Sequence, residues 1–283
     1  MLTEKRLTIP TLLRTFWRKI GVTWFLTLIE TALLALIPLF IGFAIDGLLR
    51  SETDELLNLG SVLIALVIFS VIRRVYDTRV YGTIRVELGQ ELTARSSELP
   101  VSKLNARLNM GRELANFLEE EVPQVMTSVV QLVISLLVLY SFHPTLSFLA
   151  LGAAVSMILI YAVFHRRFYK LNADINKQTE KQVGILTARK PRGIFAHLTR
   201  LRRIEVKLSD TESLVYGLIY VLLLGFVVFN LWFASTAIEN TAGTIFSIVS
   251  YSWEFVQTAV VLPITLQGWS RLSEITQRIN SAE

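Results

Sequence analysis

The stretch VPQVMTSVVQLVISLLVLYSF (residues 122–142), followed by His143-Pro144 and then TLSFLALGAAVSMILIYAVF (residues 145–164), decides the fold. Each run has about 20 residues, and a helix of that length crosses the roughly 30 Å of hydrocarbon in a bilayer. No alternation of period two competes with a helix, and a backbone exposed to lipid must be helical or part of a closed barrel. The sequence therefore predicts two membrane-spanning helices joined by a tight turn.

Four further apolar runs extend this pattern on both sides, approximately at residues 22–48, 56–72, 214–234 and 243–266. The run at 22–48 is too long for the apolar part of a signal peptide and lacks a small-residue cleavage site, so we expect it to remain as a span. The run at 56–72 is the weakest of the set. We predict an all-α polytopic membrane protein with six long transmembrane helices.

The overall composition agrees with this fold class. Apolar residues make up 52% of the 283 residues and charged residues 18%, whereas a soluble domain usually carries about 25% charge. The high apolar content also excludes a disordered chain. Cysteine is absent, which excludes disulfides, thiolate metal sites and cysteine nucleophiles.

The positions of the basic residues predict the orientation. Of the 28 Lys and Arg residues, 27 lie before the first span, in the two long loops or after the last span. The positive-inside rule then places both termini in the cytoplasm, and we expect a multi-pass protein of a plasma membrane, such as a bacterial inner membrane. The net charge of +5 follows from this topology and from attraction to anionic lipid, so we expect no nucleic-acid partner.

Two internal loops of about 49 residues each, residues 73–121 and 165–213, interrupt the spans. Both are rich in helix formers, and structureless loops of this length are rare in compact domains. The simplest interpretation is that the spans continue as helices into the cytoplasm and form two hairpins. Pro100 and the Lys190-Pro191-Arg192-Gly193 segment mark where the hairpins are expected to turn.

This organisation resembles the transmembrane domain of type I ABC exporters. Local segments support the resemblance: Leu36–Gly42 with Ile45–Leu49 is similar to the family's end of the first span, Leu99–Asn105 with Gly111–Leu114 to its first inner loop, and Arg271–Ser273 with Gln277–Ile279 to its exit from the sixth span. The amphipathic stretch Pro10–Lys19 resembles the family's elbow helix on the inner surface. The resemblance implies one six-helix transmembrane domain over residues 1–283, with an elbow helix at 1–21.

The resemblance also implies how the chain would work. Each hairpin tip would carry a short coupling helix, at Asn105–Glu113 and Thr187–Phe195, that docks on an ATPase. The candidate docking residues are Asn105, Arg107, Gly111, Arg189, Arg192 and Gly193. Two subunits would form the pathway, as a homodimer or with a related half, because symmetric dimers are the commonest assembly. The fourth and fifth spans would cross over to the partner subunit.

The sequence departs from the exporter pattern because it has no nucleotide-binding domain after the sixth span. It contains no Gly-x-x-x-x-Gly-Lys-Ser/Thr loop to hold phosphates. We therefore expect no enzymatic activity and no cofactor in this chain, with ATP and magnesium bound by a separate P-loop ATPase. A longer chain, or an ATPase-independent channel, carrier or regulatory membrane protein that has kept the exporter fold, remains an alternative at this point.

Polar residues inside the predicted spans suggest a substrate pathway, because each is costly in hydrocarbon. In the sixth span they recur on one helical face. The candidates are Glu254, Gln257, Tyr251, Ser247 and, in the first span, Glu30. They would favour a small cationic or amphipathic substrate. The same residues could instead hydrogen-bond between helices, and the sequence does not decide between the two interpretations.

Overall fold

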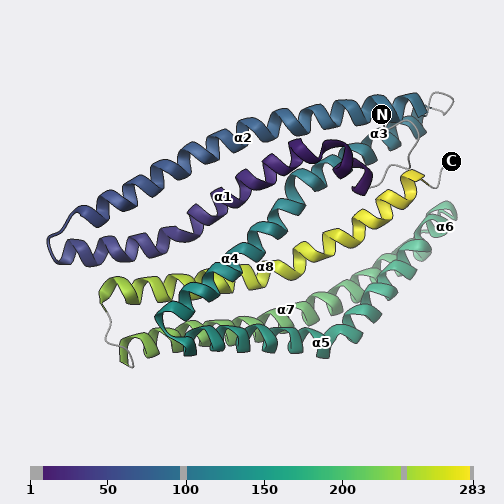
Figure 1. Cartoon of the computed structure of the whole chain (residues 1–283). Coiled ribbons are helices and arrows are strands. Elements are labelled where there is room, and N and C mark those ends of the chain that lie inside the picture. The colour runs from purple at the N-terminus through teal and green to yellow at the C-terminus, as the bar shows by residue number, and fades with distance from the viewer. Residues whose placement is uncertain (1–8, 96–100, 237–240, 281–283) are drawn as a thin grey trace. The chain divides into compact units, whose positions relative to one another are not determined.

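The computed structural model describes residues 9–95, 101–236 and 241–280; at positions 9, 10, 95, 102, 103, 106 and 262–280 it describes the backbone and not the side chains. This part of the chain is almost entirely helical, which confirms the all-α prediction (Figure 1). In chain order the elements are α1 (Ile9–Leu49), α2 (Asp54–Arg95), α3 (Val101–Asn116), the π-helical turn η1 (Phe117–Glu121), α4 (Val122–Phe142), α5 (Pro144–Glu180), α6 (Gln182–Thr187), α7 (Pro191–Thr236) and α8 (Ala242–Asn280).

The predicted spans all fall inside long helices. Five stretches of the described residues are long and apolar enough to cross a membrane, and they belong to α1, α2, the α3–α4 segment, α5 and α7. The sixth predicted span lies in α8, which has 39 residues. The chain is therefore a multi-pass membrane protein.

The spans continue well beyond the bilayer, as the sequence predicted. α2 has 42 residues, α5 has 37 and α7 has 46, whereas about 20 suffice to cross the hydrocarbon. At 1.5 Å per residue α7 is about 69 Å long. The segments 73–121 and 165–213 are consequently helical hairpins and not loops.

The ends of the spans opposite the hairpins are closed by short turns. Between α1 and α2, the Gly47 carbonyl accepts hydrogen bonds of 2.9 Å from the N–H groups of Arg50 and Glu52, and Ser51 takes a φ of 64°. Between α4 and α5, His143 is extended and Pro144 begins the next helix, a position where its missing N–H would have no intrahelical partner. Both turns are too short to form a domain of their own.

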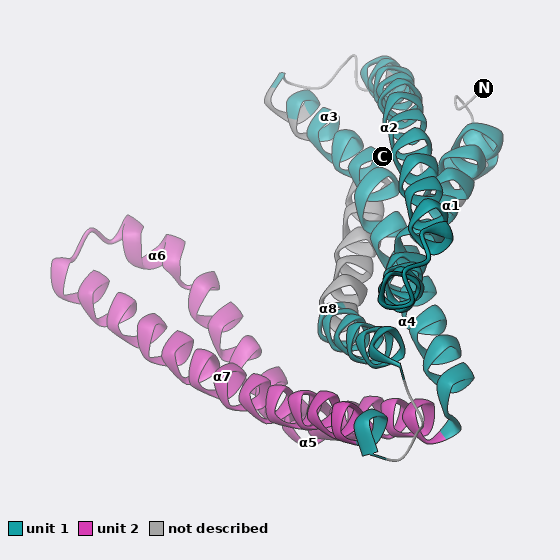
Figure 2. Ribbon diagram, turned by 90° about the vertical axis from the view of Figure 1, so that its left-hand side faces the viewer, with its two compact units in different colours: residues 1–144, 233–283 teal, residues 145–232 magenta. Residues whose placement is uncertain are grey.

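The chain divides into two compact units (Figure 2). Unit 1 contains residues 1–144 and 233–283, and unit 2 contains residues 145–232. Unit 2 is a long hairpin in which α5 and α7 lie side by side, with α6 next to the turn that joins them (Figures 1 and 2). The sequence predicted one domain of residues 1–283 and contained no signal for this division.

An apolar core lies within unit 1 on the side of the first hairpin. It joins buried side chains of α1, α2 and the α3–η1 segment, namely Leu12, Phe16, Ile20, Val80, Tyr81, Ile84, Leu88, Leu92, Leu114, Ala115, Phe117 and Leu118. On α1 and α2 these residues follow the three-to-four spacing of a helix with one buried face. The hairpin is therefore stabilised outside the membrane by ordinary hydrophobic packing.

The stretch predicted as a separate elbow helix is the beginning of α1. The helix runs from Ile9 to Leu49 without a break, although its ribbon bends near the amino-terminal end (Figure 1). Leu12, Phe16 and Ile20 are buried in the core of the first hairpin. The amphipathic pattern at Pro10–Lys19 thus reflects, in this structure, a face that packs against α2 and α3.

Helices α1 and α8 approach each other most closely at two glycines. A Cβ atom at Gly42 would lie 2.6 Å from the Gly243 carbonyl oxygen, which is closer than real Cβ contacts come. Small residues at helix contacts in membranes allow the backbones to approach in this way. Beside them, the Asp46 carboxylate accepts hydrogen bonds from the Thr241 hydroxyl and, at 2.8 Å, from the Gly243 N–H. Asp46 of α1 therefore caps the amino terminus of α8.

Replacing Gly42 by alanine should destabilise the protein. In an ordinary helix interior this change is favourable by up to about 1 kcal/mol. At Gly42 the added methyl group meets the α8 backbone, and overpacking of this kind costs about 1–3 kcal/mol. Thermal unfolding in detergent, followed by tryptophan fluorescence, should give a lower Tm. Gly217→Ala on α7, where nothing lies within 4 Å, is the matched control; an equal effect of both variants would contradict the close approach.

Candidate functional site

Two of the polar side chains predicted to line a pathway are buried between helices. The Tyr251 hydroxyl donates a 2.6 Å hydrogen bond to the Ala35 carbonyl of α1, and its side chain is 0% exposed. One turn earlier, the Ser247 hydroxyl donates to the Pro38 carbonyl at 3.2 Å. In this structure the two residues therefore hydrogen-bond between helices, which is one of the two interpretations that the sequence left open.

Glu254 differs from its neighbours on α8 because its carboxylate is not fully paired. The side chain is half-buried, and its Oε2 atom is buried without a hydrogen-bond partner among the described residues. Buried ionisable groups without a partner are costly in a membrane and mark functional positions more often than structural ones. Gln257, three residues further along the same helix, is exposed.

Glu30 takes part in a charge cluster at the boundary between the first two spans and the first hairpin. Its carboxylate forms an ion pair with Arg73 of α2. Arg73 also reaches Asp77, one turn further along α2, with a distance of 3.2 Å between Nη1 and Oδ2. Both Glu30 and Arg73 are partly buried, so the pair is screened less than a surface pair. The structure therefore gives Glu30 a role in joining α1 to α2.

A second cluster, which the sequence did not indicate, holds the π-helical turn η1. Arg85 of α2 donates to the Asn116 side-chain oxygen at 3.2 and 2.8 Å and forms an ion pair with Glu119. The Tyr81 hydroxyl donates a 2.8 Å hydrogen bond to the Leu118 carbonyl. A π turn widens the helix and leaves carbonyls to be satisfied from outside, which Tyr81 does here. Only the spatial proximity of α2 and η1 reveals this role, since the residues are more than 30 positions apart.

The predicted docking residues of the first hairpin lie along α3. Asn105 is exposed and Arg107 is partly buried. Gly111 is buried, and a Cβ atom there would collide with Leu92 and lie 3.4 Å from Leu88, both on α2. Gly111 therefore serves the packing of α3 on α2 and is not available to a docking partner in this structure. The turn itself, including Pro100, lies outside the described residues.

The predicted docking residues of the second hairpin lie at its tip and are exposed. Arg189 is in the turn between α6 and α7 with a φ of 49°, and Arg192 and Gly193 are in the first turn of α7. The expected coupling helix at Thr187–Phe195 does not form as one element. Pro191 begins α7 instead, because proline is well suited to the first turn of a helix. The short helix at this tip is α6, just before the turn.

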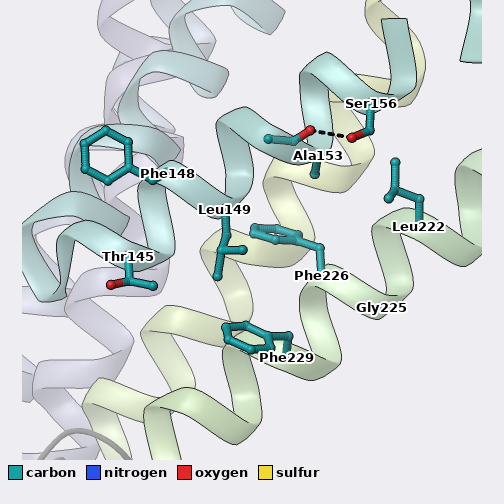
Figure 3. A pocket seen from close by; sticks show the side chains of 10 residues that line it. Thr145, Phe148, Leu149, Ala153, Ser156, Leu222, Gly225, Phe226 and Phe229 are labelled. Carbon is teal, nitrogen blue, oxygen red and sulfur yellow. Dashed lines mark hydrogen bonds between the residues drawn. The ribbon is translucent and has the colours of Figure 1, made fainter. Parts of the chain in front are cut away.

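An apolar groove of about 700 Å³ lies between α5 and α7 within the predicted spans of unit 2 (Figure 3). Its lining consists of Thr145, Phe148, Leu149, Gly152, Ala153 and Ser156 from α5 and Leu222, Gly225, Phe226 and Phe229 from α7. At Gly152 and Gly225 a Cβ atom would meet nothing within 4 Å, so the two glycines widen the groove. Such a surface can pack against lipid chains or against another transmembrane helix.

Long membrane-spanning helices, short turns on one side and two helical hairpins on the other define a multi-pass α-helical membrane protein. Residues 9–243 match the family model described as the ABC transporter transmembrane region, and the chain belongs to this family. The resemblance to ABC exporter transmembrane domains is thereby confirmed, and the chain is a membrane subunit of an ABC-type transporter. Among curated proteins, no sequence matches the chain.

The Glu30–Arg73 pair can be tested by a double-mutant cycle with Glu30→Gln and Arg73→Gln. Glu30→Gln leaves Arg73 paired with Asp77 alone, whereas Arg73→Gln leaves the partly buried carboxylates of Glu30 and Asp77 without their cation and should cost more stability, about 1–3 kcal/mol. The double variant should lose less than the sum of the single variants, because the Glu30–Arg73 interaction is then lost only once. The measurement is the unfolding temperature in detergent of the unaltered protein, the two single variants and the double variant. Strictly additive losses would show that the two side chains do not interact.

Proposed function

We propose that this chain forms the substrate pathway of an ATP-driven transporter and couples through its hairpins to a separately encoded P-loop ATPase. The observation that carries the proposal is the combination of the family match with two long helical hairpins outside the bilayer. In this proposal both termini and both hairpins face the cytoplasm of a bacterial inner membrane, on the evidence of the basic residues. ATP and magnesium bind to the partner ATPase, and this chain has no catalytic role.

The tip of the second hairpin supports a docking function. Val183 of α6 and Phe195 of α7 are each 74% exposed, and the basic residues Arg189 and Arg192 lie between them in the chain. Exposed apolar side chains at a helical tip are unfavourable in water, and such patches mark interaction sites. Surrounding positive charge assists the docking of a complementary surface. In the first hairpin, the exposed Asn105 is the corresponding candidate.

The separate unit 2 supports a dimer in which the α5–α7 hairpin packs against the partner subunit. Its spans carry many exposed apolar side chains, including Val155, Ile158 and Val221, together with the apolar groove. A second copy of the chain, or a related half, would cover part of this surface. One copy supplies only six of the helices that line the pathway, so the dimer is the transporting unit.

Glu254 and Gln257 are the proposed substrate contacts. An incompletely paired carboxylate within a span attracts a cationic or polar-headed amphipathic molecule, because such a molecule supplies the missing partner. Tyr251 and Ser247 hold α8 on α1 beside them, and Glu30 holds α1 on α2. Alternating access would follow if ATP-driven closure of the ATPases moved the hairpins and thereby reopened the cavity on the opposite side.

Replacing Glu254 by glutamine should reduce the transport of cationic amphiphiles by about tenfold while leaving assembly intact, since the variant loses the attraction to the cation but keeps the size of the side chain. The measurement is dye efflux from proteoliposomes that contain the complete transporter. Glu120→Gln, an exposed position in η1, is the matched control. Unchanged efflux in the Glu254 variant would remove this residue from the pathway.

Affinity purification from native membranes in mild detergent, followed by native mass spectrometry, tests the assembly. We expect two copies of this chain with two ATPase subunits. Phe195→Ser should lower the amount of copurified ATPase several-fold, because one anchor of an interface carries a large share of its binding energy. Tyr169→Ser, a change at a 73% exposed position of α5, is the control. A complex of two copies without an ATPase under all conditions would favour the ATP-independent alternative.

A further inference from the structure

The part of the second hairpin outside the predicted spans is built differently from the first. Among the described residues at 165–213 only three side chains are buried, and all three are polar: Gln178, His197 and Thr211. The first hairpin, by contrast, has the apolar core described above. Hydrophobic packing therefore does little to hold α5 and α7 together here, and polar groups lie between them.

A pocket of about 360 Å³ opens between α5 and α7 in this region. Its lining contains Asp174, Lys177 and Gln178 from α5, Lys181 between α5 and α6, and Arg200, Arg203, Ile204 and Lys207 from α7. Five cationic side chains thus face one carboxylate. The ion pairs found among the described residues involve only Arg73 and Arg85 as cations, so none of the five cations of this pocket forms a close ion pair there, and positive charge exceeds negative charge in the lining.

Gln178, a buried residue of the pocket lining, pairs with a histidine of α7 that does not itself line the pocket. Gln178, which is 8% exposed, lies 2.7 Å from the Nδ1 atom of His197, measured from its Nε2 atom. When the Gln178 amide donates, Nδ1 accepts and the ring N–H is on Nε2. That atom is buried without a hydrogen-bond partner among the described residues. The buried polar pair therefore fixes the two helices without supplying any negative charge to the cations around it.

One end of the pocket, at Gln178, lies far from the membrane surface. Gln178 is 14 residues beyond Phe164, the end of the fourth predicted span, which corresponds to about 21 Å along the helix. The headgroup layer extends only about 5–8 Å beyond the hydrocarbon. The potential of anionic lipids falls off within a Debye length of about 8 Å at physiological ionic strength. The Gln178 end of the pocket therefore lies beyond the headgroups, whereas Lys207, seven residues before the fifth predicted span, lies about 10 Å from that span.

We propose that the pocket between α5 and α7 binds a soluble phosphorylated small molecule, of the size of a nucleoside or sugar polyphosphate. Its volume is in the range of small-ligand sites, which is about 300–1,000 Å³. Arginine guanidinium groups bind phosphate in a bidentate manner and lysines add point charges, and the lining has both. Because the ligand bridges two helices that repel each other electrostatically, binding stabilises the hairpin by linkage.

The test uses the whole chain in phosphatidylcholine nanodiscs, with sodium tripolyphosphate as the probe. This arrangement contains no ATPase, so its outcome is independent of the proposed transport function. Isothermal titration calorimetry should detect binding, and tripolyphosphate should raise the unfolding temperature. The same titration in nanodiscs with phosphatidylglycerol should give similar binding; loss of binding there would identify a lipid headgroup as the anion and overturn the proposal.

Two double variants with the same net charge distinguish binding in the pocket from general attraction of the anion to a basic surface. Lys177→Ala/Arg203→Ala removes two lining cations, whereas Lys170→Ala/Arg202→Ala removes two exposed cations of the same helices that do not line the pocket. All four side chains are exposed, so both proteins should fold. The lining variant should bind tripolyphosphate about tenfold more weakly, and the control should change by less than about twofold. Equal losses in the two variants, or no binding by the unaltered chain, would overturn the proposal.

Discussion

The interior of a bilayer offers no hydrogen-bond partners, and the packing of unit 1 follows from this constraint. Backbone groups satisfy one another within the helices, but polar side chains must find partners on neighbouring helices. The contact between α1 and α8 meets this requirement for three polar side chains. Gly42 and Gly243 bring the two backbones together, Asp46 caps the start of α8, and Ser247 and Tyr251 donate to carbonyls of α1. Glu254 stands out because its carboxylate lacks a complete set of such partners.

The two hairpins, which extend beyond the predicted spans, are stabilised by different means. The first is filled with apolar side chains from α1, α2 and the α3–η1 segment, and the Arg85 cluster fixes its π-helical turn. The second contains few buried side chains and carries an excess of positive charge between its arms. We therefore expect the stability of the second hairpin to depend on bound anions more than that of the first.

For two predicted site residues, the structure shows contacts that the sequence did not indicate. Gly111 suggested a turn that docks a partner, but it packs under Leu88 and Leu92 of α2. Glu30 suggested a substrate contact, but Arg73 neutralises it. These contacts could not be predicted, because the sequence shows that a residue is costly or flexible at its position and does not show which neighbour compensates for it. For Glu254 the pathway prediction stands as before, and one of its carboxylate oxygens, Oε2, is buried without a hydrogen-bond partner among the described residues.

The sequence by itself determined the number and limits of the spans, their continuation into hairpins and the family of the protein. These features depend on apolar runs, on the distribution of Lys and Arg and on helix-breaking residues, all of which are local along the chain. Only the tertiary structure decided the division into two units, the close contact of Gly42 with Gly243, the ion pairs of Arg73 and Arg85 and the basic pocket between α5 and α7. Each of these joins residues far apart in sequence, and their meeting depends on how helices rotate and pack against one another, which no local pattern encodes.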